Sequence, residues 1–152
     1  MKNKKMILIV VGLVVLVTAV FAVVHLNTRT TVPEGSLLIQ HQGKDSYVQL
    51  EKLTMSEVSG SIVNGKGEQI EVRQPGISIR DVLIAAGIDA DKIKGVSAVA
   101  DDEYSAEISS EEINEQSLAY LAKEEDGTVK LIVFGDPNMK RNMRNIVKLI
   151  VN

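Results

Sequence analysis

The sequence predicts an α+β protein, in which an N-terminal transmembrane helix precedes a β-rich domain with two short helices. The transmembrane helix is predicted by an apolar stretch at residues 6–26. The β-rich domain is predicted by short segments of alternating apolar and polar residues that recur between turn signals. The helices are predicted by two Ser-x-x-acid motifs, at Ser78 and Ser109, each followed by apolar residues at helical spacing.

Residues 6–26 are apolar apart from Gly12, Thr18 and His25. At about 1.5 Å per residue, a helix of this length crosses the bilayer hydrocarbon of about 30 Å. Three lysines precede it, so the positive-inside rule puts residues 1–5 in the cytoplasm and the rest of the chain outside. A cleaved signal peptide is the alternative, but its apolar stretch is shorter, about 7–15 residues, and ends at a small-x-small site. We therefore expect an uncleaved, single-pass anchor in the cell membrane.

Residues 27–35 are polar, contain Pro33 and are typical of a tether. Residues 36–152 then make a domain long enough to bury a core without disulfides. Its expected strands are Ser36–His41, Ser46–Leu50, Glu57–Val63, Gln69–Arg73, Val96–Ala100, Tyr104–Ile108, Leu118–Lys123, Val129–Phe134 and Ile146–Val151.

The turns and caps between these strands follow from residue type. Residues 64–67, Asn-Gly-Lys-Gly, predict a hairpin turn, because Asn and Gly tolerate positive φ. Pro75-Gly76 is expected to break the chain. Ser78 and Asp81 form a capping-box pattern for a helix that Gly87 ends.

The second half of the domain contains similar turn and cap signals. An acidic turn at residues 101–103 joins two strands. Ser109 and Glu112 form a second capping-box pattern, for a helix through about Gln116. A Glu-Asp-Gly turn follows at residues 125–127, and residues 135–137, Gly-Asp-Pro, end the next strand.

Composition excludes several functions. The chain has no cysteine and two histidines, so disulfides, thiolate metal sites and a Cys nucleophile are excluded, and neither a zinc site nor catalytic residues are expected. Four of the 17 basic residues lie before Glu34, so the remaining 13 face 20 acidic residues and give the rest of the chain a net charge of −7. An acidic domain with 3% aromatic residues disfavours nucleic acid as a partner.

Two charged clusters allow alternative interpretations. The acidic residues between Asp101 and Glu115 either bind a divalent cation or form a solvated turn and helix N-terminus, which the helix dipole favours. The basic group near the C-terminus either holds an anion or phosphate, or forms a solvated face whose charge balances the acidic stretch across the domain. This group consists of Lys140, Arg141, Arg144 and Lys148.

A series of short motifs follows a fixed order through residues 57–152. They are Gly76-Ile77-Ser78, Asp81-Val82-Leu83, Ala86-Gly87-Ile88, Asp102-Glu103-Tyr104, Ser109-x-Glu111-Glu112, Asp126-Gly127, Gly135-Asp136-Pro137 and Val147-Lys148-x-Ile150. This order resembles the oxidoreductase molybdopterin-binding domain, the fold of sulfite oxidase and its bacterial relatives. The resemblance implies a sulfite-oxidase-like fold for the extracytoplasmic domain.

The chain departs from that family where the metal is held. The family uses a cysteine thiolate as a molybdenum ligand, and this chain has none. Glu103 stands where the family pattern has a glycine, and Asp136 replaces the second glycine of Gly-Gly-Pro. If a molybdopterin still binds, the resemblance implies a pocket made of Gly135, Pro137, Lys140, Arg144, Lys148, Asp102 and Tyr104.

We therefore expect a membrane-anchored, extracytoplasmic binding or structural domain without catalytic molybdenum. Its expected partners are the membrane and either another membrane protein or a small anionic ligand. One alternative is a reduced molybdopterin-dependent oxidoreductase that holds its metal without cysteine. The other is a sensor of a small anion or other ligand.

Overall fold

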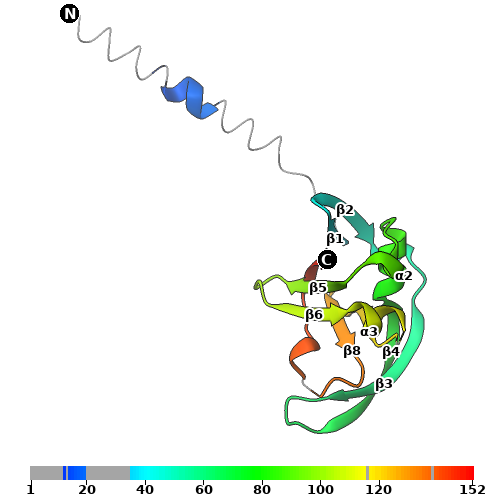
Figure 1. Ribbon diagram of the computed structural model, residues 1–152. Helices are drawn as coiled ribbons and strands as arrows, with labels where there is room; N and C mark the ends of the chain where they lie inside the picture. The colour runs from blue at the N-terminus through cyan, green and yellow to red at the C-terminus, as the bar shows by residue number, and fades with distance from the viewer. Residues whose placement is uncertain (1–11, 13, 20–34, 116, 138) are drawn as a thin grey trace, which may run out of the picture. The chain divides into compact units, whose positions relative to one another are not determined.

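In the computed structural model, which describes residues 12, 14–19, 35–115, 117–137 and 139–152, the fold is mixed α+β and mostly β-sheet (Figure 1). This confirms the predicted α+β class and its two short helices. The strands are β1 (Ser36–His41), β2 (Lys44–Gln49), β3 (Ser56–Val63), β4 (Gln69–Ser78), β5 (Gly95–Ala100), β6 (Ser105–Ser109), β7 (Ala119–Lys123), β8 (Val129–Val133) and β9 (Ile146–Val151). The helices are α2 (Ile79–Ala85) and α3 (Ser110–Asn114), with 3-10 turns η1 (Leu50–Lys52), η2 (Ala90–Lys92) and η3 (Met139–Arg141).

The expected transmembrane segment lies largely outside the described residues. Residues 12 and 14–19 of it are helical, and the tether at residues 27–34 is not described. Within the described part of the chain, no helix has both the length and the apolar character needed to span a bilayer.

The first sheet has five strands in the order β2-β1-β9-β5-β6, in which β1 and β9 run parallel and the other neighbours antiparallel. Alternate side chains point to opposite faces, so Leu37 and Ile39 of β1 share a face with Leu149 of β9. All three are at most 2% exposed. They belong to the main core, which also contains Val82 and Leu83 of α2.

The second sheet has four strands in the order β3-β4-β7-β8, all antiparallel. The prediction that Pro75-Gly76 breaks the chain is wrong, because β4 runs through both residues to Ser78. Residues 69–76 of β4 pair with β3, and only Ile77 and Ser78 pair with β7. Pro75 therefore lies where β4 has one neighbour, so the sheet does not need the N–H that proline lacks.

The end of β8 reaches back to β3. The backbone N–H of Gly135 donates to the carbonyl of Ser61 at 2.9 Å. A second, smaller core lies here and includes Val58, Ile132 and Phe134. Gly60 permits the close packing, since a Cβ built on it would lie 2.6 Å from the Phe134 ring. The β3–β4 hairpin is thus packed onto β7 and β8 by its own apolar face.

Both predicted helix caps form. The Ser78 side chain accepts a hydrogen bond from the Asp81 backbone N–H at 3.0 Å, and α2 is followed by Gly87 at φ 76°. Ser109 and Glu112 form the reciprocal capping box predicted for α3. These caps fix where β4 passes into α2 and where β6 passes into α3.

Candidate functional site

The connection between β8 and β9 carries most of the residues singled out in the sequence. Gly135 has φ 70° and no atom within 4 Å of the position that a Cβ would occupy. Pro137 and Lys140 are exposed. Asp136 lies between them in the chain, but its side chain is only 2% exposed. The connection therefore presents an open outer edge and turns one carboxylate inward.

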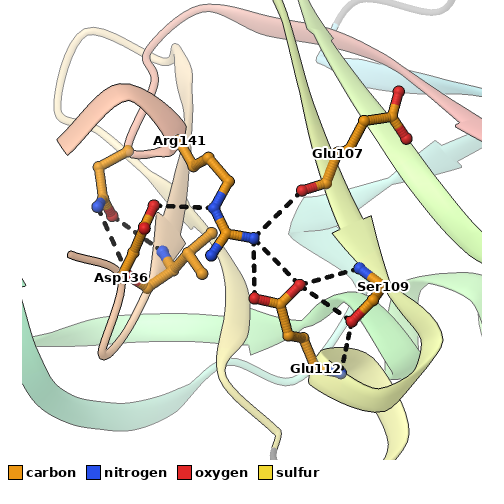
Figure 2. Close-up of polar contacts among 7 residues, drawn as sticks. Glu107, Ser109, Glu112, Asp136 and Arg141 are labelled. Carbon is orange, nitrogen blue, oxygen red and sulfur yellow. Dashed lines mark hydrogen bonds and ion pairs between the residues drawn. The ribbon is translucent and has the colours of Figure 1, made fainter. Parts of the chain in front are cut away.

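Arg141 of η3 is the partner of that carboxylate. Its Nε donates to Oδ2 of Asp136 at 2.8 Å, and its Nη1 donates to both carboxylate oxygens of Glu112, at 2.8 and 3.1 Å (Figure 2). Nη1 also donates to the backbone carbonyl of Glu107 at 3.3 Å. Figure 2 shows the guanidinium between the two carboxylates, so Arg141 ties the β8–β9 connection to β6 and α3.

The capping box of α3 is part of the same network. Oε2 of Glu112 accepts from the backbone N–H of Ser109 at 2.9 Å while also facing Arg141. Burial by itself raises the pKa of Glu112, but the hydrogen bonds from Ser109 and Arg141 outweigh it and lower the pKa below its ordinary value. The hydrogen bond to Asp136 is the main cause that raises the pKa of Arg141. Both shifts favour the charged forms of Glu112 and Arg141 at neutral pH.

This arrangement leaves little room for an external anion. A phosphate that used the Arg141 fork would have to displace Asp136 or Glu112, and displacing Asp136 would leave its buried carboxylate without that cation. The chain also has no thiol to hold molybdenum. The residues present therefore do not fit a metal-bound molybdopterin at this connection.

Of the two other cations on the connection, Arg144 is paired, and Lys140 is unpaired within the described residues. Arg144 Nη2 lies 3.5 Å from Oε2 of Glu124, and its side chain is 69% exposed. Glu124 lies 3.9 Å from Lys130 as well. Lys140 is exposed, and it has no ion pair within the part of the chain that the structure describes.

The structure brings Asp102 and Tyr104 to the far end of this connection. They lie in the β5–β6 turn, where Oδ1 of Asp102 accepts from the Tyr104 backbone N–H at 3.1 Å. The neighbouring Asp101 N–H donates to the carbonyl of Asn145 at 3.0 Å, which joins the turn to the residue before β9. Glu103 has φ 67°, a conformation that glycine adopts most easily, at the position where the molybdopterin-domain pattern has glycine.

Lys148 occupies a different place, in the middle of the five-stranded sheet. It lies opposite Leu38 of β1 and Val99 of β5, on the face turned away from the main core. Leu38 is in turn opposite Tyr47 of β2, and Val99 is opposite Ser105 of β6. One row of side chains therefore crosses all five strands, with Lys148 at its centre.

A second row runs beside the first on the same face. It includes Gln40, Ile150 and Ser97, in register on three adjacent strands. Ser97 donates to Oε1 of Glu107 on β6 at 2.6 Å, and Gln40 donates to Asp45 on β2 at 2.9 Å. We call the two rows together the outer sheet face. Its apolar members, Leu38, Tyr47, Val99 and Ile150, are all partly exposed.

Two surface depressions lie away from the predicted pocket. One of about 540 Å³ is lined by Gln74, Pro75 and residues 123–126, and another of about 360 Å³ is lined by Lys94, Glu107 and Glu112 among others. Neither is lined by a residue of the predicted pocket. Within the described ranges, no group of three His, Asp or Glu side chains is placed to hold a metal ion.

Comparison with known proteins adds no family assignment. No protein-family model matches the chain, and no curated protein matches it significantly.

The Asp136–Arg141–Glu112 network is the feature that sequence reasoning missed. In the sequence, Arg141 belongs to the basic group and Glu112 to the acidic stretch, and the ion pair between them fits the alternative in which the two groups balance each other. The sequence pattern presents Asp136 only as the replacement of a glycine. A charged residue between Gly135 and Pro137, five residues from an arginine, was the available signal.

Proposed function

We propose that the chain is a membrane-anchored, extracytoplasmic binding domain that docks onto another membrane protein. We further propose that its fold is related to the molybdopterin-binding oxidoreductases and that it works without catalytic molybdenum. The observation that carries the binding function is the outer sheet face, which mixes partly exposed apolar side chains with a central lysine.

The composition of this face is that of a reversible protein interface. Leu38, Tyr47, Val99 and Ile150 supply apolar area, with tyrosine among the residues enriched at interfaces. Lys148 supplies a positive charge, and Asp45 and Glu107 supply negative charges at the two edges of the sheet. Such charges select a partner. A purely structural surface would expose polar side chains at these alternate positions instead.

The anchoring proposal rests on residues 6–26 and on the lysines before them. The tether at residues 27–35 reaches about 30 Å when fully extended. The domain would therefore stay close to the bilayer, where its partners are other proteins of the same membrane.

Photo-crosslinking in cells tests the docking surface. A photoreactive amino acid is placed at Tyr47 or Val99 on the outer sheet face, and at Ile84 as the control. Ile84 is an exposed apolar residue, 55% accessible, on α2. We expect the same membrane protein to be crosslinked from Tyr47 and Val99 and not from Ile84. Equal crosslinking from all positions, or none, would contradict the proposal.

Elemental analysis tests the absence of a catalytic centre. The full-length protein is purified from a host that makes molybdopterin, and its molybdenum and pterin contents are measured. We expect neither above background, because the chain has no thiol and Asp136 occupies the Arg141 fork. Molybdenum and pterin at one equivalent per chain would instead establish the reduced oxidoreductase.

A thermal-shift series separates docking from anion sensing. A ligand that binds only the folded state stabilises it as its concentration rises above Kd. We expect phosphate, sulfate and molybdate to leave Tm unchanged. Stabilisation that disappears in the Lys140→Ala variant would favour the anion sensor, because Lys140 is the exposed cation beside Gly135 and Pro137.

A further inference from the structure

The turn between β3 and β4 contains an Asn-Gly pair, Asn64-Gly65, at the outer end of the hairpin (Figure 1). In such a pair the backbone nitrogen of the second residue can attack the side-chain amide of the first. Glycine favours the attack because it has no Cβ to shield the nitrogen. The proposed docking function does not use this turn.

The turn holds the Asn64 side chain in a defined position. Its Oδ1 accepts hydrogen bonds from the backbone N–H of Lys66 at 2.9 Å and of Glu68 at 3.0 Å. Its Nδ2 donates to Oε2 of Glu68 at 2.9 Å. The bond from Lys66 makes an Asx-turn, which folds the Asn64 side chain back over the backbone of Gly65.

The same hydrogen bonds favour the reaction electronically. Attack on the amide carbon pushes negative charge onto Oδ1. Two backbone N–H donors already point at that oxygen, as in an oxyanion hole.

We propose that Asn64-Gly65 is a site of spontaneous deamidation in the folded protein. The Gly65 nitrogen loses its proton to solvent base and forms a bond to Cγ of Asn64, which closes a succinimide ring. The Cγ–Nδ2 bond breaks, and Nδ2 leaves with the electron pair as ammonia after taking a proton from water. Water then opens the ring at either carbonyl, which gives aspartate or isoaspartate at position 64.

The product changes the hairpin. A carboxylate at position 64 faces Glu68 in place of the amide that donated to it, so a hydrogen bond becomes a like-charge contact. Isoaspartate also lengthens the backbone by one carbon, which disturbs the two bonds from Lys66 and Glu68. The modification therefore loosens the turn that closes the β3–β4 hairpin.

Peptide mapping of the aged full-length protein tests the proposal. Trypsin releases the peptide Leu53–Lys66, in which Asn64 is the only residue with an amide side chain. A mass increase that corresponds to replacement of NH₂ by OH in this peptide therefore assigns deamidation to Asn64. The peptide Asn145–Lys148 serves as the control, because Ile146 follows its asparagine. After incubation in mildly alkaline buffer, we expect deamidated Leu53–Lys66, with an isoaspartate form separable by chromatography, and unchanged Asn145–Lys148.

Two variants check the mechanism. Gly65→Ala shields the attacking nitrogen and is expected to slow the reaction several-fold. Asn64→Gln, which would have to close a larger ring, is expected to abolish it while keeping a neutral amide in the turn. An unmodified Leu53–Lys66 peptide, or equal rates in wild type and Gly65→Ala, would overturn the proposal.

Discussion

At the scale of single residues, Arg141 is the side chain on which the β8–β9 connection depends. It neutralises Asp136, whose carboxylate is almost fully buried, and it also binds Glu112 at the start of α3. A buried carboxylate that loses its cation is strongly destabilising, whereas an exposed ion pair contributes little. Arg144, paired with Glu124 but 69% exposed, is the natural comparison.

We predict that Arg141→Ala lowers the free energy of unfolding by about 3 kcal/mol, because the buried carboxylate of Asp136 loses the cation that neutralises it. Arg144→Ala should change it by less than about 1 kcal/mol. Urea unfolding of the full-length variants measures both. Equal losses in the two variants would show that Arg141 is only another surface cation.

The stability of the fold should also depend on the ionisation of Glu112. Its pKa in the folded state lies below the ordinary value of 4.5, so the ionised form stabilises the fold above that pH. This contribution is lost as the pH falls through the folded-state pKa. We predict that wild type loses stability in acid and that Glu112→Gln, already less stable at neutral pH, loses less. Parallel pH profiles for the two proteins would contradict this.

At the scale of elements, the β3–β4 hairpin is held by packing as well as by its turn. Gly60 lies against the ring of Phe134, and Gly135, just after β8, donates to Ser61 on β3. A side chain at position 60 would have to displace the ring or the strand. The hairpin therefore depends on one glycine that no turn requires.

We predict that Gly60→Ala destabilises the protein by about 1–3 kcal/mol through overpacking. The same substitution should be better tolerated in a Phe134→Leu background, where the smaller side chain leaves room for the new methyl group. A double-mutant cycle by thermal or urea unfolding measures this coupling. Additive effects would mean that Gly60 and Phe134 do not compete for the same space.

Element boundaries could be predicted where a local rule decides them. The caps at Ser78 and Ser109 use hydrogen bonds between residues three apart, so the sequence alone contains both partners. The path of β4 through Pro75 could not be predicted, because it depends on which neighbour each half of the strand has. Pairing between distant segments leaves no signal at the proline itself.

The same limit applies to the predicted pocket. Gly135, Pro137, Lys140 and Arg144 are close in sequence and lie on one connection, as expected. Lys148 is only four residues beyond Arg144, yet strand alternation places it on the outer sheet face. The contact of the buried Asp136 with Arg141 could not be predicted either, because it depends on how β6, α3 and the β8–β9 connection are arranged in space.

At the scale of the whole molecule, an acidic β-rich domain follows the apolar segment at residues 6–26, which we propose to span the membrane. The domain has one sheet face on its main core and the other, the outer sheet face, partly apolar and open. An anchored domain meets its partners within the membrane plane, which raises their effective concentration and makes a modest interface sufficient. The docking proposal therefore depends on the anchor.

Membrane topology is the most direct test of this account. Bacteria that express the full-length chain with a cytoplasmic N-terminal tag are fractionated, and the membranes are washed with alkaline carbonate. Intact spheroplasts are separately treated with protease. We predict that the chain stays in the washed membranes and that external protease removes residues 36–152 but leaves the tag. A chain recovered in the soluble fraction, or a domain protected until the cells are lysed, would contradict the account.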